Sequence, residues 1–306
     1  MKLAVYLSGV PAKAKNEFKR SILTRFAYGA KKAGDEVFLV DQLAPIDCDV
    51  AVIQGWVNSK QSPHLALRSA VIKHQRKNKN HVIAIDSNLY GFLEPNDFNK
   101  YLRYSVGDVF PDRGYYFDRE VDPIRWFSIK SNYGFVERNW NVNGQHILVT
   151  LQRNGGWSMG DMPVQQWLDD ILPKIRAVSD RRIVVRPHPG NIAIVPTIRF
   201  PNLKNISWST HADLREDLNN AWATVTYNSS PGVASLLWGV PVWVTDPTPT
   251  RSQAWPYACS DLGQIENPLR PDREEFYHKL AQCHWNADEL DSGDAWRFMR
   301  HRLPNT

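Results

Sequence analysis

The sequence has 306 residues, of which 42% are hydrophobic, and its 37 Lys and Arg against 32 Asp and Glu give a formal net charge of +5 at pH 7. This length allows two domains of about 140 residues each. No apolar run approaches the ~18 residues of a membrane-spanning helix. Three scattered cysteines indicate a reducing cytoplasm and neither a disulfide framework nor a zinc site.

Strand and helix signals alternate along the first 90 residues. Short apolar runs predict strands at residues 2–7, 37–40, 50–54 and 81–85, and helical spacing predicts helices at residues 16–32 and 65–75. This alternation predicts a Rossmann-like domain with a parallel sheet. The first loop, residues 8–15, contains one glycine and lacks the G-x-G-x-x-G fingerprint of dinucleotide-binding proteins.

The fourth predicted strand is followed directly by Asp86. A carboxylate at the carboxyl end of a parallel strand is well placed to act as a general base. The alternative is that Asp86 only caps the next turn. Asp86 is therefore a catalytic candidate by position.

Aromatic residues and arginines are interleaved between residues 96 and 140, where glycines and prolines divide the chain into short pieces. These pieces predict loops or short strands. Such a mixture can stack on bases and hold phosphates. The alternative is that the aromatic side chains pack in a core while the arginines face water.

The polar, turn-rich stretch at residues 139–144 predicts a boundary between domains 1–142 and 143–306. Strand and helix signals then resume in the second half. They predict strands at residues 146–151, 183–185, 203–208 and 224–227 with a further apolar run to 244, and helices at residues 162–178, 214–220, 273–283 and 289–302.

Three predicted strands of the second half end in loops that suit a phosphate. Glycines follow Arg153, two prolines fix the backbone around His188, and Pro231 follows two serines at the start of a predicted helix. A helix N-terminus with free N–H groups is an anion site. The alternatives are a plain turn, a rigid surface loop and an ordinary helix cap.

The sequences RPHP at residues 186–189 and NSSPGVASLLWGVPV at residues 228–242 resemble the donor-binding half of GT-B glycosyltransferases. The similarity is greatest to the capsule-type (Kdo transferase-like) branch and to phage-encoded, DNA-modifying enzymes, and it covers about residues 146–245, roughly a third of the chain. It implies two Rossmann-like α/β domains that face a cleft, with a C-terminal helix that crosses back to the first domain. In the family an acidic residue usually stands where this sequence has Ala234.

The resemblance implies an enzyme that takes a nucleotide sugar, first of all a UDP-sugar, as co-substrate, with no cofactor. No D-x-D motif stands at a predicted strand end to hold a metal, so no metal site is predicted. The catalytic candidates are Asp86 and His188. His188 would either donate a hydrogen bond to a phosphate or orient another side chain. The donor-binding candidates are Gln152, Arg153, Asn154, Gly155, Trp157, Arg186, His188, Asn228, Ser229, Ser230 and Gly232. The acceptor-binding candidates are Ser8, Asn88, Tyr90, Arg103, Arg113 and Tyr115.

Three functions follow as hypotheses. The first is a glycosyltransferase that modifies hydroxymethylated pyrimidines in DNA, located in the host cytoplasm if phage-encoded, and it rests on the positive charge and the arginine–aromatic segment. The second is a transferase that builds a capsule or cell-surface polysaccharide. The third is a non-catalytic binder of nucleotide sugars or DNA on a GT-B scaffold, which the alanine at position 234 favours.

Overall fold

The computed structural model describes residues 1–57, 62–97 and 100–305, and it divides into two compact units. Unit 1 comprises Met1–Ile129 and His278–Thr306, and unit 2 comprises Lys130–Tyr277. The predicted domains were 1–142 and 143–306, so the observed division falls earlier. The final segment belongs to unit 1 because its strand completes the sheet of that unit.

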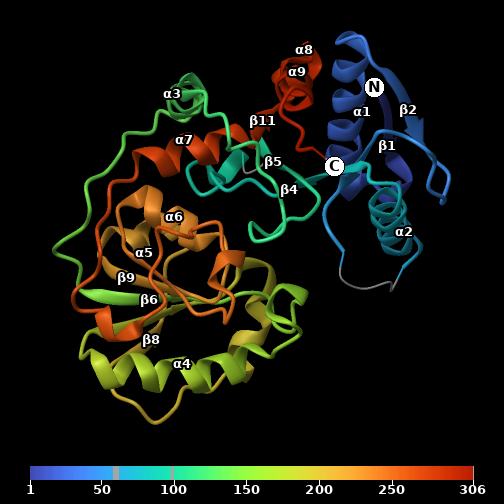
Figure 1. Ribbon diagram of the computed structural model, residues 1–306. Coiled ribbons are helices and arrows are strands. Elements are labelled where there is room, and N and C mark those ends of the chain that lie inside the picture. Colours follow the sequence, from blue (N-terminus) through green and yellow to red (C-terminus); the bar gives the residue numbers. More distant parts are fainter. Residues whose placement is uncertain (58–61, 98–99, 306) are drawn as a thin grey trace. The chain divides into compact units, whose positions relative to one another are not determined.

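The described part of unit 1 holds a six-stranded sheet in the order β11-β5-β4-β3-β1-β2 (Figure 1). The first four strands in chain order are parallel, as the sequence predicted, whereas β5 pairs antiparallel with both of its neighbours, β4 and β11. The strands are β1 (Lys2–Tyr6), β2 (Glu36–Val40), β3 (Val50–Gln54), β4 (His81–Asp86), β5 (Tyr101–Val106) and β11 (His284–Asn286).

Helices cover both faces of this sheet because alternate strand residues point to opposite sides. Leu3 and Val5 of β1 belong to one core with Phe26 of α1 (Glu17–Lys32). Ala4 and Tyr6 belong to a second core with α2 (Pro63–Lys77). Ser62 caps α2, since its Oγ accepts the N–H of Leu65 at 3.4 Å.

The predicted helix at residues 289–302 is two short helices, α8 (Ala287–Ser292) and α9 (Asp294–Arg300), separated by Gly293 at φ +84°. Both lie beside α1 (Figure 1). The approach is close: a Cβ atom on Gly29 would lie 1.8 Å from the carbonyl oxygen of Leu290. The side chain of Trp296 is 1% exposed, and its Nε1 donates to Asp35 at 2.6 Å.

Unit 2, whose backbone is described throughout, holds a parallel five-stranded sheet in the order β10-β9-β6-β7-β8. On one face of this sheet, Val149 of β6 and Val225 of β9 belong to one core with Leu168. The strands are β6 (His146–Thr150), β7 (Arg182–Arg186), β8 (Ile206–Trp208), β9 (Ala221–Thr226) and β10 (Val242–Val244). The helices are α4 (Val164–Val178), α5 (Leu214–Asn219) and α6 (Pro231–Trp238).

Two further helices lie where the chain passes from one unit to the other, α3 (Pro123–Asn132) and α7 (Glu274–Gln282). Among the described residues, no helix has the length and apolar character that crossing a membrane requires. All three cysteines are described: Cys48 and Cys283 are buried, and Cys259 is partly exposed.

Candidate functional site

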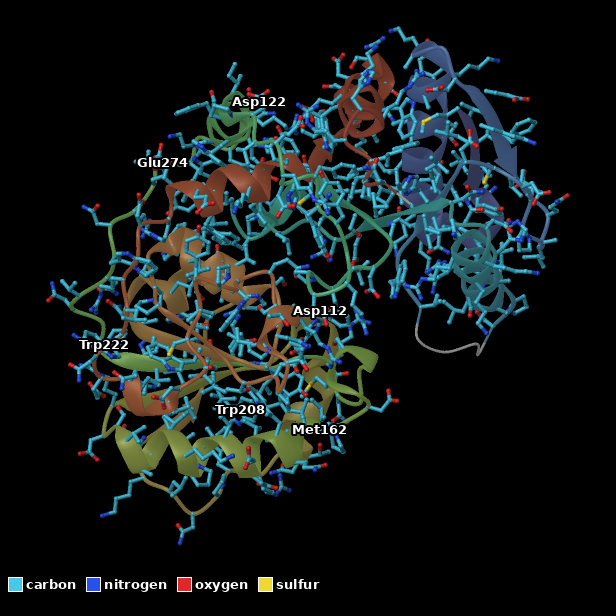
Figure 2. The ribbon with its side chains drawn as sticks, in the orientation of Figure 1. Asp112, Asp122, Met162, Trp208, Trp222 and Glu274 are labelled. Carbon is cyan, nitrogen blue, oxygen red and sulfur yellow. The ribbon has the colours of Figure 1, made fainter. Side chains whose placement is uncertain are left out.

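The candidate site of unit 2 lies where its strand order reverses. The chain runs outward from β6 through β7 to β8 and then returns to the other side of β6 as β9. In open parallel sheets, ligands bind outside the carboxyl ends of the strands at such a reversal. The two ends of the strands of unit 2 can be followed in Figure 2. Trp222, near the start of β9, lies on one side, and Met162, beyond the loop that follows β6, lies on the other.

A buried hydrogen-bond network joins the loops on the two sides of this reversal. Oε1 of Gln152, after β6, accepts the N–H of Asn228, after β9, at 3.1 Å. The same Gln152 donates to the hydroxyl of Ser158 at 2.9 Å, and Asn228 donates to the Ser158 carbonyl at 3.0 Å. Gln152 and Asn228 therefore fix the shape of the site from within, since both are more than nine-tenths buried.

The network ends on Asp246, which sequence reasoning did not single out. Its side chain is 3% exposed. Its Oδ2 accepts Nδ2–H of Asn228 at 2.6 Å, and its Oδ1 accepts the N–H of Thr248 at 2.8 Å. The available signal was its position two residues after an apolar strand, in a loop that prolines keep irregular.

Arg153 and His188, predicted from two different loops, lie together at Gly190. A Cβ atom on Gly190 would lie 2.9 Å from Nη2 of Arg153 and 3.2 Å from Cε1 of His188. Among the described residues, the guanidinium of Arg153 has no hydrogen-bond acceptor or carboxylate partner. Its charge is therefore available to an anion at this edge of the sheet.

The hydrogen bonds of His188 define its tautomer. Nδ1 accepts the backbone N–H of Gly190 at 3.0 Å, so a neutral ring carries its proton on Nε2. Burial, and next to it the positive charge of Arg153, lower the pKa of His188 below its usual value of about 6.5. At neutral pH the ring is thus a neutral donor, and Nε2 has no acceptor among the described residues.

The start of α6 adds two hydroxyl groups. Ser230 occupies the N-cap position, as the sequence predicted for one of the serines, but no side-chain cap bond forms there. The Ser229 hydroxyl lies 2.6 Å from that of Thr226. The Ser230 side chain is exposed and has no partner among the described residues. Gly232 lies inside the helix, packed against Ala254 and Val242.

Arg186 differs from the prediction of a free arginine hook. Its Nη1 lies 2.5 Å from Oδ2 of Asp217, a carboxylate that is 2% exposed. Its Nη2 donates to the carbonyl of Ala212 at 2.6 Å. Arg186 thereby fastens β7 to the loop after β8, and its role as a phosphate ligand stays a prediction that requires a further N–H group.

The other predicted donor-binding residues in the loop after β6 contribute to the structure of that loop and of the helix that follows it. Oδ1 of Asn154 accepts the N–H of Val164, the first residue of α4, at 2.9 Å, whereas the N-cap residue Pro163 makes no side-chain bond. Gly155 adopts a φ of +61°, which a larger residue would resist. Trp157 begins a short 3₁₀ helix, Trp157–Met159, and its side chain lies outside the described part of the structure.

In unit 1, Asp86 ends β4 as predicted and is paired. Its Oδ2 accepts Nη2–H of Arg103 at 2.8 Å, and its Oδ1 accepts the N–H of Ser87 at 2.7 Å. The Asp86 side chain is 30% exposed, so a ligand can reach it. Its proposed role as a base stays a prediction.

Four predicted acceptor residues are interior residues of unit 1. Ser8 donates to the carbonyl of Gln42 at 2.8 Å, and Oδ1 of Asn88 accepts the N–H of Tyr90 at 2.9 Å. Ser8, Asn88, Tyr90 and Arg103 are 7%, 3%, 0% and 5% exposed. Contact with an acceptor would therefore require this interior to open.

The remaining two, Arg113 and Tyr115, lie at the opposite edge of the same sheet. They line a pocket with His81, which begins β4, whereas Asp86 ends that strand. Five residues of extended chain separate the two ends by roughly 16 Å. The structure thus does not gather the predicted acceptor residues into one site.

Neither a known protein family nor a curated protein matches this sequence. Solved structures do match its fold. The β-Kdo 2,4 transferase KpsC of Thermosulfurimonas dismutans aligns with a TM-score of 0.58 at 12% identity, over 95% of this chain and 98% of that one. Its β-Kdo 2,7 transferase aligns with a TM-score of 0.54 at 12% identity, over 99% and 100%.

The fold is that of a GT-B glycosyltransferase. This confirms the predicted fold class of an α/β chain with two Rossmann-like sheets. At 12% identity the likeness concerns the backbone, so the chemistry must be argued from this chain's own residues.

Proposed function

We propose that this protein is a glycosyltransferase that uses a nucleotide sugar, whose phosphates bind at the carboxyl edge of the unit 2 sheet. The observation that carries the proposal is the meeting of Arg153 and His188 at Gly190. Both present N–H groups without acceptors among the described residues, and the exposed hydroxyl of Ser230 begins α6 after another strand of the same sheet. Such a set of donors suits a diphosphate.

The proposed chemistry is stabilisation of a leaving group. When the bond between sugar and phosphate breaks, negative charge develops on the phosphate oxygens. Arg153 offers a permanent positive charge, and neutral His188 offers a hydrogen bond from Nε2. Donors that the fold already holds in place stabilise this charge without reorganising during the reaction.

The names of the two similar structures support Kdo as a sugar to test and a glycan as the acceptor. A hydroxymethylated pyrimidine in DNA is the second candidate acceptor, supported by the net charge of +5 and by the exposed arginines 113 and 119. We keep Asp86 as the proposed base that deprotonates the acceptor hydroxyl, since its carboxylate is partly exposed.

The test begins with binding of CMP-, UDP-, GDP- and dTDP-linked sugars, measured by calorimetry and thermal shift. Arg153→Ala removes one charge-assisted hydrogen bond, worth about 1.5–3 kcal/mol. We expect it to weaken the binding of the preferred nucleotide sugar roughly 10- to 100-fold. Mass spectrometry of glycan and hydroxymethylated DNA acceptors then identifies the product.

Arg182→Ala is the matched control. Arg182 begins β7 at the other edge of the same sheet and donates to the hydroxyl of Ser207 at 2.9 Å. It removes the same charge from unit 2, so nucleotide-sugar affinity should be unchanged. Equal losses in the two variants, or no binding of any nucleotide sugar by the unaltered protein, would contradict the proposal.

A further inference from the structure

We propose that unit 1 carries a separate binding site for a small phosphorylated molecule. The site is the pocket at the start of β4, the end of that strand opposite to Asp86. The pocket has a volume of about 410 Å³, within the range of about 300–1,000 Å³ that is typical of small-molecule sites. Its wall includes the start of β4, the end of β5 and the loop that follows β5. All its lining residues belong to unit 1.

The lining is positively charged. It contains three arginines, Arg76, Arg113 and Arg119, against one aspartate, Asp112. Burial lowers the pKa of His81, which also lines the pocket, so this imidazole is neutral at pH 7. The pocket therefore presents an excess of guanidinium groups, which match the geometry of phosphate oxygens.

Two of these arginines, Arg76 and Arg113, form ion pairs with one buried carboxylate. Asp108 is 4% exposed, and its Oδ2 lies 3.1 Å from Nε of Arg113 and 3.9 Å from Nη2 of Arg76. Arg76 also donates to the carbonyl of Gly107 at 3.0 Å. Nε of Arg113 also lies 3.9 Å from Oδ1 of Asp112, so two carboxylates orient and balance these two guanidinium groups.

Arg119 has no carboxylate partner among the described residues. Its guanidinium carbon lies 5.0 Å from the centre of the Tyr115 ring, a cation–π contact that places it at the pocket. Burial raises the pKa of Tyr115, so its hydroxyl stays protonated at neutral pH. Arg119 is the charge in this pocket that a ligand phosphate is best able to neutralise.

The loop that carries these groups is closed at its base, so the site is formed without a ligand. Val106 and Tyr115 exchange backbone hydrogen bonds of 2.8 and 3.0 Å, and Gly107 donates to the carbonyl of Val82 at 2.9 Å. Val82 and Val106 add an apolar wall. This combination suits a phosphate attached to a small organic group better than phosphate alone.

The test uses the full-length protein with Arg153→Ala as background, so that the proposed donor site of unit 2 contributes little. The probes are phenyl phosphate and inorganic phosphate, and their binding is measured by calorimetry. We expect phenyl phosphate to bind the tighter of the two, and Arg119→Ala to weaken it at least tenfold. Arg119→Lys should restore part of the affinity, because it keeps the charge.

Arg297→Ala is the control, since Arg297 is an exposed arginine of unit 1 that pairs with Asp294 at 2.9 Å. It should leave phenyl phosphate binding unchanged. Failure of phenyl phosphate to bind, or equal binding with and without Arg119, would overturn the inference. Neither result bears on the glycosyltransferase proposal, which Arg153 tests in the other unit.

Discussion

The predicted site residues of unit 2 lie at strand ends, as their sequence pattern indicated. They differ in whether their polar atoms are already hydrogen-bonded within the protein. Gln152, Asn154 and Arg186 direct their polar atoms to other parts of unit 2. The side-chain N–H groups of Arg153 and Nε2–H of His188 have no acceptor among the described residues, which is why we propose them as ligand contacts. A sequence reveals which residues end a strand, whereas the partner of Arg186, Asp217, comes from a helix that no local pattern connects with it.

The contacts of His284 in unit 1 were likewise not predictable from the local sequence, and they lead to a prediction about stability in acid. It is completely buried, Nε2 accepts the N–H of Leu89 at 3.2 Å, and Nδ1 lies 2.8 Å from the carbonyl of Leu280. Burial, helped by the charges of Arg103 and Arg125, lowers the pKa of His284 to about 3. Its neutral form is therefore part of the folded state.

Protonation of His284 should destabilise the protein in acid. Below the unfolded pKa of about 6.5, His284 is protonated in the unfolded state and neutral in the folded state. The free energy of unfolding therefore falls by about 1.4 kcal/mol per pH unit until pH reaches about 3. His284→Gln removes this titration. Urea unfolding between pH 7.5 and 4.5 should give a shallower pH dependence in this variant.

The exposed His301→Gln variant is the control and should keep the steep pH dependence of the unaltered protein. His284→Gln is also expected to be less stable at pH 7.5, where only packing and hydrogen bonds differ. An unchanged slope in His284→Gln would mean that other groups govern the acid transition.

At the scale of elements, the parallel strands of both sheets were predictable because apolar runs of three to six residues end at polar loops. Strand β5 was missed, since its arginine and tyrosines read as part of a loop segment. Arg103 sits in the interior of that strand because Asp86 of the neighbouring β4 neutralises it. This pairing joins residues whose sequence neighbours give no hint of the contact.

The packing of α1 against α8 gives a prediction about Gly29. Alanine favours a helix over glycine by about 1 kcal/mol. Here its methyl group would lie 1.8 Å from the carbonyl oxygen of Leu290, so one helix must move. We expect Gly29→Ala to lower the free energy of unfolding by about 1–3 kcal/mol, as measured with urea.

Tyr28→Ala is the matched control, because Tyr28 neighbours Gly29 on the same helix and is 59% exposed. It should change the free energy of unfolding by less than about 0.5 kcal/mol. A Gly29→Ala variant as stable as this control would show that α1 and α8 separate without cost.

For the whole molecule, the sequence predicted the two-sheet α/β class but placed the division later than the structure does. Residues 139–144 read as a turn-rich boundary after the irregular segment 96–140, whereas unit 2 begins at residue 130. The return of the chain was expected only for its last helix. It also includes β11, a three-residue strand that is too short for its pairing with β5 to be recognised in a sequence.

The distribution of the three thiols allows each unit to be addressed chemically. Burial raises the pKa of Cys48 to about 11 and that of Cys283 to about 12, and both belong to unit 1. A maleimide reacts with thiolates, so the folded protein should take up one label quickly, at the partly exposed Cys259 of unit 2, and three labels in denaturant. Cys259→Ser should abolish the fast reaction, and a fast reaction that survives this change would place an accessible thiol in unit 1. A fluorophore can thus be attached to the proposed sugar-nucleotide unit alone, without removing either of the other cysteines.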